Sequence, residues 1–354
     1  LDPIPPSHVA HVFLEVFARL AQHPLLDSFR VLGEQLLVAR DGTTSVSSQA
    51  LSCQHCLRRQ LANGHTLAYH AAITPVVVCP GRAQVLALPP EHLMPQDGHE
   101  QQDCEQMAGT RWLHKHAHAL APHGVTVLGD DLSSTQPLCA VALEQGCNFL
   151  LGCKPDAHPT LDERVAFWQA NDGIAVWESR PWNGRFTEVS RERWLKDVRL
   201  GDGKEALAVH GLEITVSNAT PGALLSHNSF GTTHRVTAAT VAAVAQAGRG
   251  RWKIEPANNK VRKTKGYHRE HNFGHGKQYL AMVMPRLNLL AFLFHTVLEG
   301  SDEHYTFLRQ VLARRQTFFT DLQALMRYLV FDSWDHLMEF MLRGLALQSS
   351  LDTS

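Results

Sequence analysis

Three carboxylates stand at the ends of apolar runs or beside a basic block, where they could hold metal ions. Asp41 ends a run that starts at Leu36, Asp130 ends a run that starts at Val125, and Glu255 closes the stretch Arg-Trp-Lys-Ile-Glu. Phosphodiester chemistry can use two divalent ions about 3.5–4 Å apart, which stabilise the attacking and leaving oxygens. Mg²⁺ prefers oxygen ligands such as carboxylates. The three residues therefore predict a metal-dependent site for phosphodiester chemistry.

The apolar runs before Asp41 and Asp130 are typical of buried strands. If these strands are neighbours in a mixed sheet, both carboxylates lie at one edge, and Glu255 reaches them from a packed helix. Asp131 competes with Asp130 for the second position. Because successive side chains on a strand point to opposite faces, we expect only one of the two to enter the site.

The other patterns predict an α/β fold with a mixed sheet flanked by helices. Strand-like runs, bounded by turn residues, cover 66–78, 84–88, 125–130 and 148–153. Helical patterns, with apolar residues every three or four positions, cover 7–21, 103–122, 139–145, 237–246 and 279–347. Residues 172–234 carry short β-favouring runs between turns, which indicates a β-rich insertion.

The charge of the chain is unevenly distributed. The formal net charge is -1, yet residues 249–277 contain nine Lys or Arg against two Glu, which gives this segment +7 and the remainder -8. Such a segment is the electrostatic footprint of a nucleic-acid site, with a solvated polar face as the alternative. The cations that we assign to the DNA backbone are Arg251, Lys253, Lys260, Arg262, Lys263, Lys265, Arg269 and Lys277.

Composition indicates a globular protein of a reducing compartment. An apolar content of 44% over 354 residues is enough for a large core. Seven scattered cysteines do not resemble a secreted disulfide framework, which favours the cytoplasm. The apolar stretch 287–298 is shorter than the roughly 20 residues of a membrane span, so we expect none. The chain opens at Leu1 on a Pro-rich segment without a visible signal peptide, and we expect a preceding segment to be missing.

A second group of residues could bind a softer metal ion. Cys53 and Cys56 have the spacing of a zinc knuckle, and His65 and His70 follow. Thiolate and imidazole are the ligands that tetrahedral Zn²⁺ prefers. The sequence leaves open a structural zinc site and a hairpin with reduced cysteines and unrelated histidines.

Three further histidines follow the basic block. His268, His271 and His275 would share one face of a helix, since their spacings are three and four. The neighbouring glycines and cations favour a polar surface that approaches a phosphate backbone. A metal site and an ordinary helix surface are the alternatives. Farther on, apolar side chains recur at helical intervals between 318 and 341, which predicts core packing, with a dimer interface as the alternative.

Several short motifs resemble the DDE transposases of bacterial insertion sequences, in the branch whose RNase H-like core carries a β-rich insertion. The motifs occur in the expected order and extend over most of the chain. They are Asp41-Gly42-Thr43 with Ser47-Ser48, Gln96-Asp97-Gly98 with Asp103-Cys104-Glu105, Gly129-Asp130-Asp131-Leu132, Arg251-Trp252-Lys253-Ile254-Glu255, and Lys265-Gly266-Tyr267-His268 running into 270–277.

The resemblance implies an activity and a domain plan. Asp41, Asp130 and Glu255 would form a catalytic triad that binds two Mg²⁺ or Mn²⁺ ions, cuts transposon ends and joins them to target DNA. The partners would be double-stranded DNA and a second copy of the chain, on the nucleoid of a bacterial cytoplasm. The division is 1–30 (N-terminal helical segment), 31–155 (first part of the RNase H-like core), 156–236 (β-rich insertion), 237–300 (second part, with the basic helix) and 301–354 (helical C-terminal extension).

The chain departs from the family pattern around the glutamate. Gly248 stands where related transposases often have Tyr, and Arg262 where they have Lys. Pro256 directly follows Glu255, so we expect the glutamate at a kink or at a helix start. The alternatives to a transposase are an RNase H-like nuclease that cuts without joining and an inactive or domesticated DNA-binding derivative.

Overall fold

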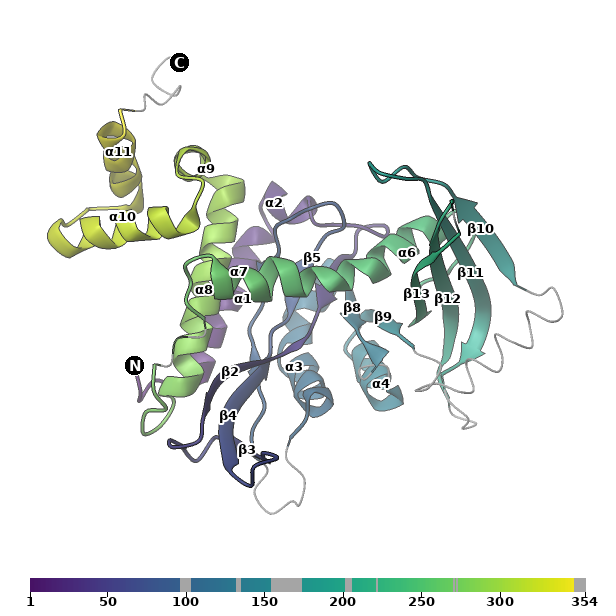
Figure 1. The fold of residues 1–354 in the computed structure, drawn as a ribbon, viewed down its shortest axis with the longest axis horizontal. Coiled ribbons are helices and arrows are strands. Elements are labelled where there is room, and N and C mark those ends of the chain that lie inside the picture. The colour runs from purple at the N-terminus through teal and green to yellow at the C-terminus, as the bar shows by residue number, and fades with distance from the viewer. Residues whose placement is uncertain are drawn as a thin grey trace.

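The computed structural model describes residues 1–95, 103–131, 135–153, 174–200, 206–220, 222–269, 271 and 273–346. Its centre is a nine-stranded mixed sheet in the order β10-β11-β12-β13-β9-β8-β1-β5-β6. A four-stranded sheet of β2, β3, β4 and β7 lies beside it (Figure 1). The strands are β1 (Leu36–Ala39), β2 (Gly42–Ser48), β3 (Leu57–Gln60), β4 (Thr66–Ile73), β5 (Val76–Val78), β6 (Leu86–Ala87), β7 (Glu91–His92), β8 (Val125–Gly129), β9 (Asn148–Gly152), β10 (Ala175–Ser179), β11 (Glu188–Arg199), β12 (Ala208–Asn218) and β13 (Leu224–Thr232).

The core of the large sheet has the strand arrangement of an RNase H-like fold. β1 pairs antiparallel with β5 and parallel with β8, which in turn pairs parallel with β9. Parallel neighbours need a crossover connection. α3 lies in the connection from β1 to β8, and α4 lies in the connection from β8 to β9. The predicted mixed sheet flanked by helices is therefore confirmed.

The two sheets are joined by one long bent hairpin. Ala39 is opposite Val76 in the large sheet, and Gly42 is opposite Ile73 in the small one, so one register runs across the bend, up to a shift between Thr44 and Val46. The Thr74 N–H donates to the Asp41 carbonyl at 3.0 Å at the bend. Pro75 has no N–H to continue the ladder, which explains why the strand predicted over 66–78 is divided into β4 and β5.

The helices cover both faces of the large sheet and form the C-terminal part. They are α1 (Pro6–Leu20), α2 (Pro24–Asp27), α3 (Glu105–Leu120), η1 (Ala121–His123), α4 (Gln136–Glu144), α6 (Val241–Arg249), η4 (Gly250–Lys253), η5 (Ile254–Asn259), α7 (Lys260–Thr264), α8 (Leu280–Ser301), α9 (Glu303–Val311), α10 (Arg315–Tyr328) and α11 (Trp334–Gly344). Leu37 of β1 lies under Gly250 of η4, whereas Arg40 lies under Gly109 of α3. Since residues three apart on a strand point to opposite faces, η4 and α3 lie on opposite sides of β1.

The β-rich insertion extends the large sheet. β10, β11, β12 and β13 form an antiparallel meander, and β13 pairs with β9 through Thr232 opposite Leu150. In Figure 1 these strands project to the right of the core. The insertion is therefore attached through backbone hydrogen bonds, while its treatment as a separate domain stays a prediction.

The apolar residues form two cores. The larger core contains the side chains between the sheet and helices α1, α3, α4, α6 and α8. A smaller one is built by α9, α10 and α11 around Tyr305, Phe318 and Met338. Most of the apolar stripe predicted between 318 and 341 thus packs inside the C-terminal helices, although Met326 and Leu329 are exposed.

One helix, α8, is long and apolar enough to cross a membrane by length and composition alone. It begins at Leu280, seven residues before the apolar stretch at 287–298 that the sequence singled out. Half of its most apolar window is buried in the structure. It packs against α1 and β6 and buries Arg286, which is the environment of a core helix.

Candidate active site

Asp41 and Asp130 follow two neighbouring parallel strands. In the pairing of β1 with β8, Ala39 is opposite Leu128, so the same register two residues later brings Asp41 opposite Asp130. The Arg40 N–H still donates to the Leu128 carbonyl at 3.3 Å, which carries the pairing beyond the strands. Because side chains alternate between faces, the two carboxylates lie on one face of the sheet.

Glu255 lies in an irregular turn of a continuous helical segment. The segment passes from α6 through the 3-10 turn η4 and the π-helical turn η5 into α7. Pro256 removes a backbone donor there, and isolated π turns occur frequently at functional sites. Ile254 anchors the turn in the core, and the Asn259 amide donates to Glu255 Oε2 at 3.0 Å. Glu255 therefore lies in irregular backbone within a continuous helical segment and not at a helix start, and a kink at this position stays a prediction.

The three carboxylates are close enough to act on one another electrostatically. Burial raises the pKa of Asp41, the Arg251 guanidinium opposes this shift, and the charges of Asp130 and Glu255 raise the pKa further. A pKa raised by neighbouring anions is the response expected of carboxylates that share one site. Asp41 thus lies within electrostatic range of Asp130, Glu255 and Arg251, and the assignment of the three carboxylates to one metal site stays a prediction.

A fourth carboxylate, which the sequence analysis did not assign, belongs to the same group. Glu105 is the first residue of α3, and a Cβ at position 42 would overlap its carboxyl group, so Gly42 leaves the room that it occupies. Burial raises the pKa of Glu105, and the charges of Asp41 and Asp130 raise it further. The available signal was its place in the first turn of a helix between two core strands.

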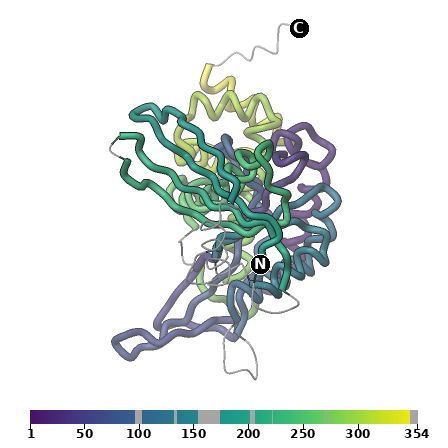
Figure 2. Tube along the Cα trace, turned by 90° about the vertical axis from the view of Figure 1, so that its right-hand side faces the viewer, coloured from purple at the N-terminus to yellow at the C-terminus, as the bar shows by residue number. Residues whose placement is uncertain are grey.

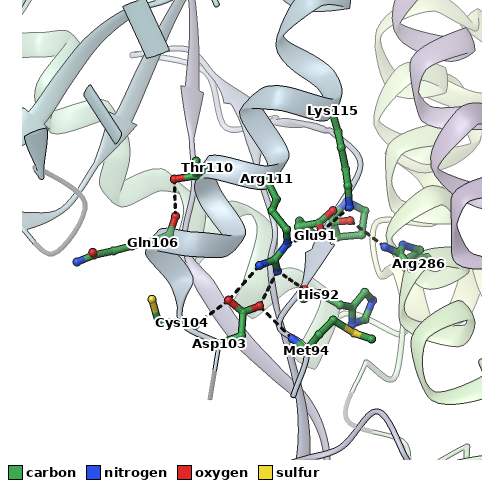
Figure 3. A network of polar contacts seen from close by, with 11 residues as sticks. Glu91, His92, Met94, Asp103, Cys104, Gln106, Thr110, Arg111, Lys115 and Arg286 are labelled. Carbon is green, nitrogen blue, oxygen red and sulfur yellow. Dashed lines mark hydrogen bonds and ion pairs between the residues drawn. The ribbon is translucent and has the colours of Figure 1, made fainter. Parts of the chain in front are cut away.

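The start of α3 is fixed by a network of charged side chains (Figure 3). Asp103 accepts hydrogen bonds from the N–H groups of Met94 and Cys104 and from the guanidinium of Arg111. Arg111 also pairs with Glu91 of β7 at 3.2 Å. These bonds tie the first turn of the helix to the small sheet, and with it the backbone of Glu105.

A buried arginine lies beneath the carboxylates. Arg40 is 5% exposed, and glycine at position 109 leaves space for its guanidinium. Burial lowers the pKa of Arg40 to about 10, while Asp130, Cys139 and Glu105 oppose this shift. Its Nε and Nη2 have no hydrogen-bond partner among the described residues. The side chain therefore supplies a fixed positive charge below a group of anions.

A cleft of about 530 Å³ opens beside Asp130. Its walls include Arg251 and Trp252 from η4 and His227 and Phe230 from β13, so core and insertion both contribute. Asp131 lines the cleft as well. Trp252 is 48% exposed, which leaves an aromatic face and a guanidinium available to a ligand next to the carboxylates.

The cations that the sequence assigned to DNA divide into two groups. Lys260, Lys263, Lys265 and Lys277 are exposed. Lys253 donates to the carbonyls of Cys79 and Arg82, buried Arg262 donates to Asn258 Oδ1 at 2.9 Å, and buried Arg269 donates to Thr43 Oγ1 and the Thr44 carbonyl. These three side chains therefore have partners within the fold, and the contact with the DNA backbone that the sequence predicted for Lys253, Arg262 and Arg269 stays a prediction.

The Cys and His residues form a cluster with one ligand different from the predicted set. Cys53, Cys56 and His70 lie together, and His275 is the fourth member. His65 is exposed at the β3–β4 turn. It is five residues from His70, an odd separation, so along an extended strand the two side chains point to opposite faces.

The three later histidines do not share a helix. α7 ends at Thr264, and His268, His271 and His275 lie in an irregular segment before α8. His268 has a positive φ of 51°, outside the helical range, and is exposed, as is His271, whereas His275 is buried. Of the motifs that carry the resemblance, residues 96–98, Leu132, Glu270 and Asn272 lie outside the described residues.

Comparisons with known proteins found one kind of likeness. No protein-family model and no curated protein sequence matches the chain. A solved structure of a piggyBac transposase in a synaptic complex with hairpin DNA aligns with a TM-score of 0.44 and 8% sequence identity. The alignment covers 90% of this chain and 58% of the piggyBac chain, so the present chain spans less than two thirds of its length.

Proposed function

We propose that the chain is a DDE-type transposase that cuts transposon ends and joins them to target DNA in a metal-dependent reaction. The observation that carries the proposal is the parallel pairing of β1 with β8, whose register leads to Asp41 opposite Asp130, with Glu255 within electrostatic range of Asp41. Carboxylates that converge from distant parts of a chain onto one face of a sheet are what two hard cations require.

The donor set fits Mg²⁺ or Mn²⁺. All of the groups are carboxylates, and Arg40 and Arg251 lie within electrostatic range of them. Asp41, Asp130 and Glu255 would hold the ions, with Glu105 next to them. When bound, such ions activate an oxygen nucleophile and stabilise the leaving oxygen.

The chain's own side chains would bind and orient the DNA. Arg251 offers a cation between Asp41 and the cleft, and the indole of Trp252 lies beside it. The exposed Lys260, Lys263 and Lys265 follow on the same helical segment, where they can contact successive phosphates. Arg40 lies below the carboxylates and balances part of their repulsion. A second copy of the chain would serve the second transposon end.

The test is cleavage of a DNA duplex that carries the transposon end. Asp41→Asn, Asp130→Asn and Glu255→Gln should each lower Mg²⁺-dependent cleavage by more than about 100-fold, because changes in merely outer-shell partners already cost 10–100-fold. DNA binding should remain. Glu144→Gln, which changes an exposed carboxylate at the end of α4, is the matched control and should cut almost normally. Retained cleavage in all three variants would reject the assignment.

A nuclease that cuts without joining is the second candidate, since the same carboxylates would serve it. A duplex with a pre-cleaved 3′-hydroxyl end separates the two. A transposase joins this end to target DNA, and a nuclease leaves it free. Joining that depends on Asp41 and Glu255 would settle the choice for the transposase.

A further inference from the structure

Four potential metal ligands outside the carboxylate site lie within reach of a single ion. The ligand atoms of Cys53, Cys56, His70 and His275 are all within 4.8 Å of one another. The two Sγ atoms are 3.6 Å apart, and His70 Nε2 is 3.2 Å from Cys53 Sγ and 3.3 Å from Cys56 Sγ. His275 Nδ1 is 3.3 Å from Cys56 Sγ.

These separations are close to the edges of a zinc tetrahedron. Zn–S bonds of about 2.3 Å and Zn–N bonds of about 2.0 Å at tetrahedral angles place two sulfurs about 3.8 Å apart and a sulfur and a nitrogen about 3.5 Å apart. The observed distances are shorter than these values by only 0.2–0.3 Å, a difference that small rotations of the side chains remove. Two thiolates and two imidazoles are a preferred donor set of Zn²⁺.

The backbone around the cluster supports this geometry. The Cys53 N–H donates to Cys56 Sγ at 3.2 Å, and the Cys56 N–H donates to the Cys53 carbonyl at 3.1 Å, so the knuckle is a closed turn. Gly274 and Gly276 flank His275 with φ values of 84° and 68°, which other residues rarely adopt. The loop thus turns sharply on both sides of the fourth ligand.

The cluster is also largely shielded from solvent. Cys56, His70 and His275 are 4%, 2% and 6% exposed. His275 Nε2 has no hydrogen-bond partner among the described residues, and its Nδ1 contacts only a weak sulfur partner. An imidazole that is buried with so little hydrogen bonding is costly unless one nitrogen binds a ligand.

We propose that Cys53, Cys56, His70 and His275 bind one structural Zn²⁺ that fastens the small sheet to the segment between the basic helix and α8. All four positions are filled by protein ligands, which is the closed coordination of a structural site. Cys53 and Cys56 come from the loop between β2 and β3, His70 comes from β4, and His275 lies 20 residues beyond Glu255. This site is separate from the carboxylate ions and holds whether or not the chain transposes DNA.

The position of the cluster indicates that the ion would connect two segments of the fold. Arg269, six residues before His275, donates to Thr43 Oγ1 and the Thr44 carbonyl of β2. Zinc and Arg269 would thus fasten the same two segments at two points. Asp41 directly precedes β2, and Glu255 precedes α7. The zinc ion and Arg269 would therefore connect the segment that follows Asp41 with the segment that follows Glu255.

The first experiment measures metal in the purified wild-type protein. We expect about one zinc per chain and, by X-ray absorption, two sulfurs at about 2.3 Å and two nitrogens at about 2.0–2.1 Å. Replacement by Co²⁺ should give the visible spectrum of a tetrahedral thiolate site. A metal-free protein that takes up neither Zn²⁺ nor Co²⁺ when supplied at equal concentration would overturn the proposal, as would a Cys53–Cys56 disulfide in protein kept under reducing conditions.

Variants identify the ligands. His275→Asn and Cys53→Ser should lose zinc, whereas His65→Asn and Cys104→Ser, which change an exposed histidine and an exposed cysteine, should keep it. Zinc lost from His65→Asn but kept in His275→Asn would contradict the ligand set. Asp41→Asn should keep one zinc per chain. If the wild-type chain binds zinc but does not cut DNA, the proposed function is wrong and the proposed zinc site is unaffected.

Discussion

The carboxylate group and the Cys/His cluster both include residues of the hairpin that follows β1, yet they differ in donor atoms, in burial and in spacing. Asp41 and Asp130 follow strands of the main sheet, Glu105 begins α3, and these carboxylates repel one another. The Cys and His ligands lie in loops and on β4, and their ligand atoms touch. Ligands that the fold holds apart suit metal ions that must exchange ligands with a substrate. Four protein ligands that surround one ion suit a metal that remains bound as part of the structure.

The carboxylate group and the Cys/His cluster also differ in how far their side chains are buried. Asp130 borders an open cleft, and Glu105 and Glu255 are exposed, so a ligand can approach. In the Cys/His cluster, Cys56, His70 and His275 are buried. Figure 2 shows the β3–β4 hairpin projecting away from the C-terminal helices. Cys56 and His70 lie at the end of this hairpin opposite to its tip, since Leu57 pairs with Tyr69 and Gln60 with Thr66. The carboxylate group is arranged for a reaction with a substrate, and the Cys/His cluster is arranged to connect two segments of the chain.

The largest expected effect comes from removing the ion from the closed site. Zinc at a thousand times its dissociation constant would stabilise the fold by about 4 kcal/mol. We expect a strong zinc chelator to lower the melting temperature and to expose β3 and β4 to hydrogen exchange. His275→Asn should melt at the same low temperature with or without chelator. Equal protection of β3 and β4 from hydrogen exchange before and after chelation would show that zinc does not stabilise the small sheet.

The next effect tests the open site through its unexpected member. Glu105→Gln should lower cleavage or the apparent affinity for Mg²⁺ by about 10–100-fold, the range found for groups that support metal ligands. Glu144→Gln, an exposed carboxylate at the end of α4, is the matched control. Gly42→Ala should act in the same direction, because its methyl group displaces the Glu105 carboxyl group. Activity at the wild-type level in both Glu105→Gln and Gly42→Ala would exclude Glu105 from the site.

A smaller effect concerns the exposed cations beside the carboxylates. Lys260→Ala and Lys265→Ala should each reduce the slope of log K against log salt for DNA binding by about 1, the amount expected for one phosphate contact. Lys253→Ala is the contrasting variant. Its amine is bonded to two backbone carbonyls, so we expect a loss of stability and an unchanged slope. A changed slope for Lys253→Ala alone would reverse the division between DNA-facing and structural cations.

The smallest effect is on the stability of the metal-free open site. The pKa of Asp41 is raised in the folded state, so this state holds the proton more tightly than the unfolded chain does. The free energy of unfolding therefore falls as pH rises through the folded-state pKa. Asp41→Asn should melt at a higher temperature than the wild type at pH 7 and at the same temperature below pH 3.8. A lower melting temperature at pH 7 would show that Asp41 is stabilised by partners instead.

The sequence predicted what local patterns encode. Apolar runs that end in a carboxylate identified β1 and β8, and Pro256 predicted irregular backbone at Glu255. The sequence did not connect Glu105 with the other carboxylates or His275 with the cysteines, because the first turn of a helix and a row of histidines do not indicate partners far along the chain. His275 meets a cysteine 219 residues earlier in the chain. Lys253, Arg262 and Arg269 carry the same charge as their exposed neighbours, and only tertiary packing decides which are buried.

The register of the bent hairpin limits how this molecule can change in length. Asp41 and the proposed zinc ligand His70 lie on the two arms of one ladder, whose register shifts by one residue between Thr44 and Val46. On each side of this shift, side chains keep their face of the sheet only while residues are added or removed in pairs. An odd insertion that slipped the ladder on one side would turn the side chains of that part to the opposite face. Growth at the β3–β4 tip, beyond both sites, is free of this constraint, and homologous chains should therefore vary there first.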